Sequence, residues 1–112
     1  MSCVWITGNS GSGKTTLGRK MLAEAKGRAV LLDGDVMRWV WPGLGLDEAG
    51  RREQNMRVAR LAVALMGQGF DVIVATICPY RDLRAQVQRM TDCKFIYLPG
   101  GKTGPDYPYE EE

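Results

Sequence analysis

Histidine is absent from the 112-residue sequence. Its absence excludes the Ser-His and Cys-His pairs of nucleophilic catalysis and the commonest zinc ligand, so proton transfer falls to carboxylates or water. Cysteine is also scarce: the chain has 3 cysteines, and none of them form a C-x-x-C pair. Because their number is odd, we expect free thiols in a reducing compartment, and therefore a cytoplasmic protein.

Long apolar runs and a strong charge of one sign are missing as well. No stretch reaches the length of a membrane span, and the N-terminus lacks the basic and apolar segments of a secretion signal. The net charge of +2 gives no reason to expect a nucleic acid or a membrane as partner. We expect a single minimal domain over residues 1–112, with an irregular C-terminal tail over residues 99–112.

A glycine-rich loop is the sharpest feature that is present. The sequence from Gly8 to Thr15 fits the phosphate-binding pattern G-x-x-x-x-G-K-[ST] at every fixed position. In such a loop the backbone wraps a phosphate, the lysine reaches the outer phosphates, and the final hydroxyl binds a bridging magnesium ion. An incidental glycine-rich turn is the alternative, but the loop lies between an apolar run and a helical pattern, as its chemistry requires. The pattern therefore predicts that ATP and Mg²⁺ are bound by Gly8, Asn9, Ser10, Gly11, Ser12, Gly13, Lys14, Thr15 and Thr16.

Strand-like and helix-like segments alternate along the rest of the chain. Apolar runs predict strands over residues 3–7, 29–32, 72–77 and 94–98. Helical patterns predict helices over 16–26, from about 36, from about 47 to 66, and over 82–90. In the third helix the apolar stripe Val58, Leu61, Ala62 and Leu65 is expected to pack against the sheet. This alternation predicts an α/β fold with a parallel sheet.

Two carboxylates, Asp33 and Asp35, follow the second predicted strand. Ligands of open α/β sheets collect beyond the carboxyl ends of the strands, so both acids are expected to face the phosphate loop. One could act through water on the magnesium ion, and the other could accept a hydroxyl proton from the group that attacks the phosphate. Capping of the next helix is an alternative role for both, and the two roles are compatible. Arg38 lies one turn beyond Asp35 and could meet an anionic substrate.

Polar residues also crowd the start of the third predicted helix. Arg52 and Asn55 are three residues apart and share a face. A solvated helix face explains any one of these polar residues, and it is our interpretation of Arg51, Arg57 and Arg60. The segment from Cys78 to Arg81 follows the third predicted strand, so it is expected at the same sheet edge as the phosphate loop.

Taken together, these segments resemble the adenylylsulfate kinase (APS kinase) family over nearly the whole chain. The phosphate loop is followed by Leu32 to Arg38, which looks like the family's L-D-G-D-x-x-R, and Arg52 to Arg57 is similar to its R-x-E-N-I-R. Ile77 to Arg81 looks like I-S-P-Y-R, and Thr103 to Glu110 looks like T-G-x-D-D-P-Y-E. Many kinases share the phosphate loop, whereas this combination of motifs is much more specific.

The resemblance implies transfer of the γ-phosphate of MgATP to the 3′-hydroxyl of adenosine 5′-phosphosulfate (APS), giving the sulfate donor PAPS. It implies that Lys14 and Asp35 are catalytic, with Asp35 near the attacking hydroxyl, and that Thr15 and, through water, Asp33 hold the magnesium ion. It places the nucleotide substrate against Asp35, Arg38, Arg52, Asn55, Ile77, Cys78, Pro79 and Lys102. Together with right-handed crossovers, it implies a three-layer P-loop fold with strand order 2-3-1-4.

The sequence also departs from the family pattern. Only Pro99 to Lys102 stands where the family has an arginine-bearing lid, and no fifth strand follows Glu110, so we expect a lid-less form. The sheet edge beside which the family has its fifth strand is expected to be exposed here or covered by a partner, such as a second copy of the chain. Leu46 and Lys102 stand where the family has aromatic residues, and Arg51 stands where it has an acidic one. Two alternatives therefore remain: a P-loop kinase for another nucleotide, nucleoside or modified base, and an ATP-binding module without catalysis.

Overall fold

Four short strands form one parallel sheet in the order β2-β3-β1-β4. They are β1 (Cys3–Thr7), β2 (Ala29–Asp33), β3 (Asp71–Ala75) and β4 (Lys94–Tyr97) in the computed structural model, which describes residues 2–111. The interior strands β1 and β3 are the most buried, as a sheet covered on both faces requires. The predicted α/β class and strand order are confirmed.

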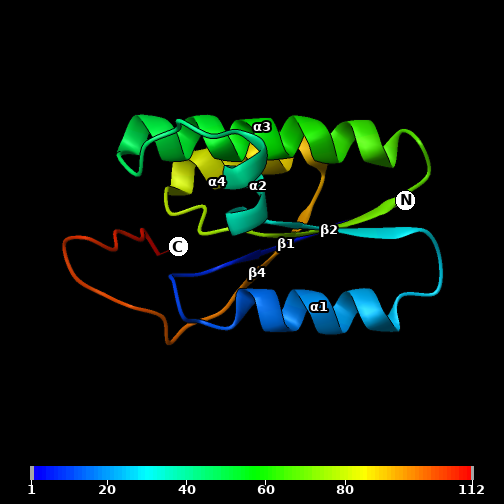
Figure 1. Cartoon of the computed structure of the whole chain (residues 1–112), viewed down its shortest axis with the longest axis horizontal. Helices are drawn as coiled ribbons and strands as arrows, with labels where there is room; N and C mark the ends of the chain where they lie inside the picture. Colours follow the sequence, from blue (N-terminus) through cyan, green and yellow to red (C-terminus); the bar gives the residue numbers. More distant parts are fainter. Residues whose placement is uncertain (1, 112) are drawn as a thin grey trace.

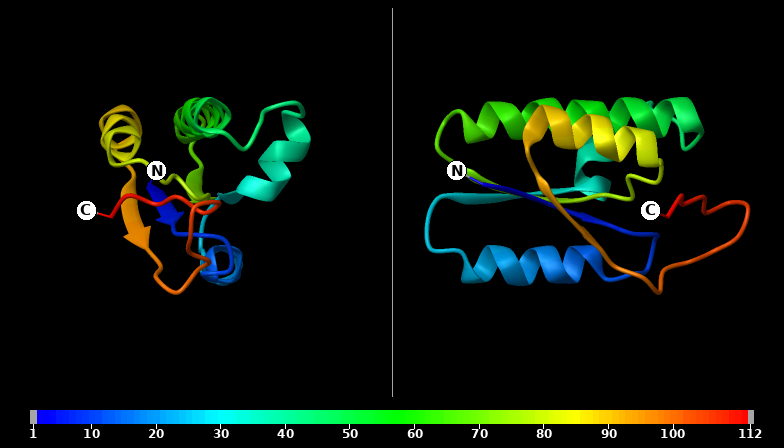
Figure 2. Two further views of the ribbon diagram at one scale, coloured as in Figure 1. Left: turned by 90° about the vertical axis from the view of Figure 1, so that its left-hand side faces the viewer. Right: turned by 180° about the vertical axis from the view of Figure 1, so that it is seen from behind.

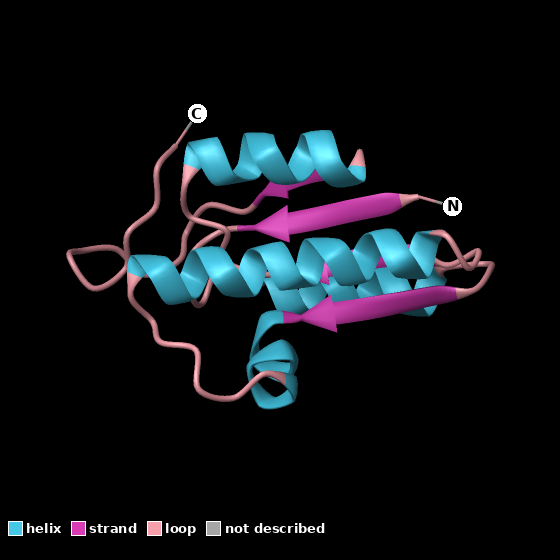
Figure 3. Cartoon of the chain, turned by 90° about the horizontal axis from the view of Figure 1, so that it is seen from above, coloured by secondary structure: helices cyan, strands magenta, loops and turns pink. Residues whose placement is uncertain are grey.

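Helices cover both faces of this sheet and make three layers (Figures 1 and 2). Helix α1 (Lys14–Glu24) lies on one face. Helices α2 (Gly34–Val40), α3 (Glu48–Met66) and α4 (Arg81–Thr91) lie on the other, where α3 and α4 run side by side (Figure 3). Because all four strands are parallel, their carboxyl ends meet at one edge, where the loops that lead into the helices begin.

The predicted apolar stripe of the third helix is confirmed. In α3, Val58 and Ala62 are fully buried, and Leu61 and Leu65 are partly buried against the same core. The core continues into β1 and α4. The stripe therefore fixes which side of α3 faces the sheet, and with it the side that its first turns present to the sheet edge.

Several element boundaries differ by one or two residues from those predicted, and two of these differences lie beside the phosphate loop or its opposite wall. Helix α1 begins at Lys14, two residues before the predicted start, because Gly13 precedes it in a left-handed conformation with φ of 98°. Strand β3 ends at Ala75 rather than at residue 77. The hydroxyl of the next residue, Thr76, is hydrogen-bonded to the side chain of Asn55 in α3.

The expectation of free thiols is wrong for two of the three cysteines. Cys3 and Cys93 form a disulfide, and their Cα atoms lie 4.4 Å apart. The reason is strand register: Val4 of β1 pairs with Lys94 of β4, so the residues before them meet across adjacent strands. An odd cysteine count requires only one unpaired thiol, which is that of the buried Cys78.

The tail beyond β4 forms no helix or strand up to residue 111 and folds back over the carboxyl edge of the sheet. The hydroxyls of Tyr109 and Thr7 lie 2.9 Å apart, and the amide of Glu110 donates to the carbonyl of Pro79 over 2.7 Å. The guanidinium of the buried Arg84 donates to the carbonyls of both Cys78 and Glu110. Within residues 2–111, no helix combines the length and the apolar character needed to cross a membrane.

Candidate nucleotide site

The phosphate loop runs from the end of β1 to the start of α1 and is shaped by its glycines. Gly8, Gly11 and Gly13 all have positive φ angles, of 153°, 84° and 98°. A side chain at Gly8 would also collide with the backbone, because its Cβ would lie 2.5 Å from the carbonyl oxygen of Leu98. The loop therefore needs glycine at these positions to expose its amides beside the N-terminus of α1.

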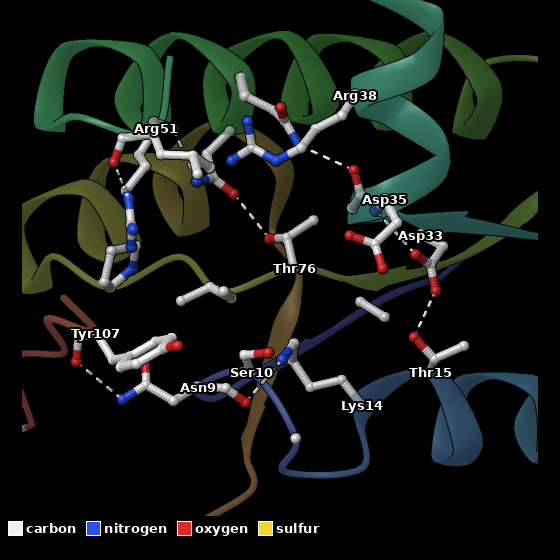
Figure 4. A pocket seen from close by; sticks show the side chains of 18 of the residues that line it. Asn9, Ser10, Lys14, Thr15, Asp33, Asp35, Arg38, Arg51, Thr76 and Tyr107 are labelled. Carbon is white, nitrogen blue, oxygen red and sulfur yellow. Dashed lines mark hydrogen bonds between the residues drawn. The ribbon is translucent and has the colours of Figure 1, made fainter. Parts of the chain in front are cut away.

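A cavity of about 700 Å³ opens above this loop at the carboxyl edge of the sheet (Figure 4). The phosphate loop and the start of α1 form its lower wall, and the ends of β2 and β3 and the first turns of α2 and α3 form most of the rest, with a contribution from the tail. Most of the predicted site residues line it: Asn9, Ser10, Gly11, Gly13, Lys14, Thr15, Thr16, Asp33, Asp35, Arg38, Asn55, Ile77 and Pro79. The structure thus brings residues from four separate stretches of the sequence, 9–16, 33–38, 55 and 77–79, to one cavity.

Asp33 holds two parts of the site together. Its Oδ1 accepts the backbone N–H of Asp35 over 2.9 Å and so caps α2. Its Oδ2 accepts the hydroxyl of Thr15 over 2.6 Å. The capping role and the position beside the phosphate loop are therefore both present in Asp33. Asp35, in the first turn of α2, lines the cavity instead.

Lys14 lies between the loop and the two acids. Its Nζ donates to the carbonyl oxygen of Asn9 over 3.0 Å. Burial lowers the pKa of Lys14 below its ordinary value, while the charges of Asp35 and Asp33 act in the opposite direction. A partly desolvated ammonium group of this kind interacts more strongly with an anion than one in open water.

Two guanidinium groups face the same cavity from the opposite wall. Arg38 comes from α2 and Arg51 from α3, and both line the cavity (Figure 4). Burial lowers the pKa of Arg38, and the positive charge of Arg51 lowers it further. Two cations held near one another favour an anion between them, so this wall suits a ligand with phosphate or sulfate groups.

Five predicted site residues lie outside the cavity. Gly8 and Ser12 are part of the loop but not of the cavity wall. The guanidinium of Arg52 donates to Asp82 and Glu48 and lies over the ring of Tyr80. These hydrogen bonds raise the pKa of Arg52, and the one to Asp82 contributes most. Cys78 is fully buried, and burial raises the pKa of its thiol to about 12. Lys102 is exposed, with its ammonium 5.4 Å from the ring centre of Tyr107.

The structure brings other residues into the cavity that sequence reasoning did not assign there. Arg51, predicted on a solvated face, is half-buried and lines the cavity, and so do Gln54 and Thr76. A signal for Arg51 and Gln54 was available: the buried stripe of α3, extended back from Val58 by three, four and seven residues, reaches Asn55, Gln54 and Arg51. Among the other cavity residues, Leu46, Asp106 and Tyr107 lie in loops, where no helical period marks them.

The chemistry of the cavity fits a phosphate chain and a magnesium ion. Among residues 2–111, the buried side-chain atoms without a hydrogen-bond partner are Asn9 Oδ1, Ser12 Oγ and Gln54 Oε1, and all three belong to the loop or the cavity wall. The adjacent oxygens of Thr15 and Asp33 are hard ligands of the kind that Mg²⁺ prefers. Three-residue clusters of His, Cys, Asp or Glu are absent from the described part of the chain.

Proteins similar to this chain in sequence include adenylyl-sulfate kinases. The sequence model described as adenylylsulphate kinase matches residues 1–98. An adenylyl-sulfate kinase from Burkholderia ambifaria is 45% identical over 89 residues, which cover 76% of this chain and 49% of that protein. The chain thus spans about half the length of the curated relatives it matches.

Solved structures give the same result. The APS kinase of Mycobacterium tuberculosis in complex with AMPPNP and APS has a TM-score of 0.71 and 33% identity, over 86% of this chain and 60% of that chain. A hexameric APS kinase from Thiobacillus denitrificans has a TM-score of 0.80 and 34% identity, over 98% of this chain and 23% of that chain.

Proposed function

The chain belongs to the adenylylsulphate kinase family, and from this premise we propose that it phosphorylates APS at the 3′-hydroxyl with ATP, giving PAPS. The observation that carries the proposal is the cavity itself. A phosphate loop forms one wall, two arginines form the opposite wall, and the carboxylate of Asp35 lies between them. Such a cavity suits two anionic nucleotides whose reacting groups meet.

In the proposed reaction, the 3′-oxygen of APS forms a bond to the γ-phosphorus of ATP, and the bond from that phosphorus to the bridging oxygen of ADP breaks. The hydroxyl proton passes to Asp35. Lys14 and the loop amides hold the outer phosphates, while Arg38, Arg51 and Asn55 hold the acceptor. Thr15 and Asp33 would hold Mg²⁺, which neutralises charge on the phosphates when bound. Because phosphoryl transfer depends mostly on positioning and charge neutralisation, Lys14 carries more of the rate than Asp35.

Release of ADP that depends on APS tests this proposal. We expect turnover in the wild-type chain and none above background in Lys14→Ala, because the outer phosphates lose their cation. Lys20→Ala is the matched control, since Lys20 is an exposed lysine of the same helix. Binding of ATP without any phosphorylated product from APS would contradict the proposal and support a module without catalysis.

A second acceptor class has a specific observation in its favour. Arg52 and Lys102, which the family resemblance implies are substrate-binding, lie outside the cavity. A kinase of the same fold with another nucleotide or nucleoside as acceptor accommodates this arrangement. An acceptor screen separates the two: phosphorylation of APS alone eliminates the second class, and phosphorylation of another acceptor with APS inactive eliminates the first.

We further propose that the enzyme acts in the cytoplasm and self-associates. The family relative from Thiobacillus denitrificans is hexameric. In this chain the short strand β4 lies at one edge of the sheet, where a second copy could pair with it. The Cys3–Cys93 bond is the observation that stands against the cytoplasmic location, because disulfides are rare in a reducing compartment, so the redox state of these two cysteines in cells decides it. Alkylation of cysteines in intact cells tests the location, and sedimentation of the purified chain tests the assembly.

A further inference from the structure

A chain of three hydrogen bonds, two of them buried, lies at the cavity and links β1 through Thr76 to α3, and we call it the buried relay. The indole N–H of Trp5 in β1 donates to Thr76 Oγ1 over 2.9 Å. The hydroxyl of Thr76 donates to Asn55 Oδ1 over 2.7 Å, and Asn55 Nδ2 donates to the carbonyl of Arg51 over 2.9 Å. Trp5 is fully buried, and Thr76 and Asn55 are 4% and 5% exposed.

The direction of the relay is fixed at both ends. An indole N–H can only donate, and a backbone carbonyl can only accept. The Thr76 hydroxyl therefore accepts a hydrogen bond from the indole N–H and donates its own hydrogen to the side-chain oxygen of Asn55. The amide oxygen accepts from Thr76 and one amide hydrogen is donated to Arg51, so the second amide hydrogen is the donor that Asn55 has left for the cavity it lines.

This orientation matches the electrostatics of the cavity wall. Arg38 and Arg51, which face the same space, are also pure donors. An amide turned the other way would present its oxygen beside them and repel the anionic oxygens that they attract. Thr76 lies at the centre of the site, between the phosphate loop and the arginine wall (Figure 4).

We propose that Trp5 and Thr76 are positioning residues that keep the Asn55 amide turned with its N–H toward the acceptor nucleotide. This inference rests on the proposed function, since it names what the relay does for the acceptor. Trp5 occupies a fully buried position in an apolar strand, so packing alone would account for its ring. In addition, the indole N–H acts through Thr76 to orient the side-chain amide of Asn55 in α3, so that the amide presents an N–H to the cavity.

Removal of single relay groups tests the inference through the kinetic constants. Thr76→Val removes the hydroxyl, and Trp5→Phe removes the indole N–H while keeping an aromatic ring beside Phe95. We expect the KM for APS to rise about threefold to tenfold in each, the cost of one hydrogen bond, with the KM for ATP unchanged. Thr76→Ser keeps the hydroxyl and is expected to restore the wild-type KM. Trp39→Phe is the matched control, because Trp39 is 81% exposed.

A double-mutant cycle separates positioning from general damage. If Thr76 acts through Asn55, then Thr76→Val added to Asn55→Ala raises the KM for APS no further than Asn55→Ala alone. If the two changes multiply, or if the KM for ATP rises equally, the inference is overturned. Should Thr76→Val not fold, the same cycle is run with Trp5→Phe. A wild-type chain that does not turn over APS defeats the proposed function and this inference with it, whereas an active wild type with unaffected variants defeats the inference alone.

Discussion

At the scale of single residues, Asp35 and Asp33 show how two carboxylates two positions apart take different tasks. Asp33 is buried and has both oxygens occupied, by the amide of Asp35 and by the hydroxyl of Thr15. Asp35 is exposed and lines the cavity. A carboxylate with no structural task can accept a proton, so the acid–base role in the proposed reaction falls to Asp35.

Asp35→Asn is therefore expected to lower kcat about 100-fold, the lower end of the range for general-base catalysis, because phosphoryl transfer needs little proton abstraction. The KM for ATP should change little, since Asp35 is not part of the phosphate loop. Steady-state kinetics of ADP release measures both constants. Asp92→Asn is the control: Asp92 has a φ of 58°, which asparagine also adopts, and it lies at the far end of α4. An unchanged kcat in Asp35→Asn would remove the proton-accepting role.

Cys78 gives a prediction about pH. Its thiol is fully buried, and burial raises its pKa to about 12. In the unfolded chain the pKa of a cysteine is about 8.5. A group whose folded pKa is raised contributes its full stability below the unfolded pKa and loses it as the pH rises toward the folded value. The loss is about 1.4 kcal/mol per pH unit, or about 2 kcal/mol between pH 8.5 and pH 10.

Urea unfolding at these two pH values, compared between wild type and Cys78→Ala, isolates this contribution because the raised pKa values of Tyr80 and Tyr109 are common to both chains. We expect the wild type to lose about 2 kcal/mol more than the variant. Equal losses would mean that the thiol does not titrate on unfolding as its burial requires.

The neighbouring residues Arg51 and Arg52 show which side-chain roles can be predicted from the sequence and which cannot. A family motif favoured Arg52, but its guanidinium forms hydrogen bonds with Glu48 of α3 and Asp82 of α4 and does not line the cavity. Helical period alone would have favoured Arg51, which continues the buried stripe. Roles that depend on rotation about a helix axis follow from periodicity, whereas partners on another helix, such as Asp82, do not.

At the scale of elements, β1 and β4 are joined both by their ladder and by the Cys3–Cys93 disulfide, whose cysteines are 90 residues apart. Closing a loop of that length restricts the unfolded chain by about 4 to 5 kcal/mol in the entropic account. We expect reduction to lower the free energy of unfolding by up to this amount, seen as a lower urea midpoint in the presence of a phosphine reductant. A chain with both cysteines changed to serine is the control, because the reductant should not affect it. An unchanged midpoint for the wild type would show that the bond does not constrain the unfolded state.

The regular elements follow from local pattern, whereas the tail does not. Each predicted strand and helix is present, with ends shifted by a few residues where backbone geometry at Gly13 or Thr76 decides them. The tail could be predicted as irregular from its glycines and prolines. Its course over the sheet edge depends on Arg84, a buried arginine that binds the carbonyls of Cys78 and Glu110. Contacts between such distant segments leave no periodic trace in the sequence.

At the scale of the whole molecule, the candidate site belongs to no single layer. The cavity takes residues from α1 on one face of the sheet, from α2 and α3 on the other, and from the tail. The sequence could predict the wall that one contiguous motif builds, from Asn9 to Thr16. The opposite wall depends on how α2 and α3 pack, and only part of it, including Arg38 and Asn55, was predicted.

A ligand that fills such a cavity ties these layers together, so binding should stabilise the whole fold. At a concentration of MgADP 100-fold above its dissociation constant, linkage adds about 2.7 kcal/mol, which is about 10 °C in melting temperature for a domain of this size. Differential scanning fluorimetry measures the shift. We expect chelation of magnesium to reduce it, because the oxygens of Thr15 and Asp33 then lose their ion, and Lys14→Ala to abolish it. APS added to MgADP should raise the melting temperature further, since it occupies the arginine wall; no additional shift would exclude APS as the acceptor while leaving the nucleotide-binding loop intact.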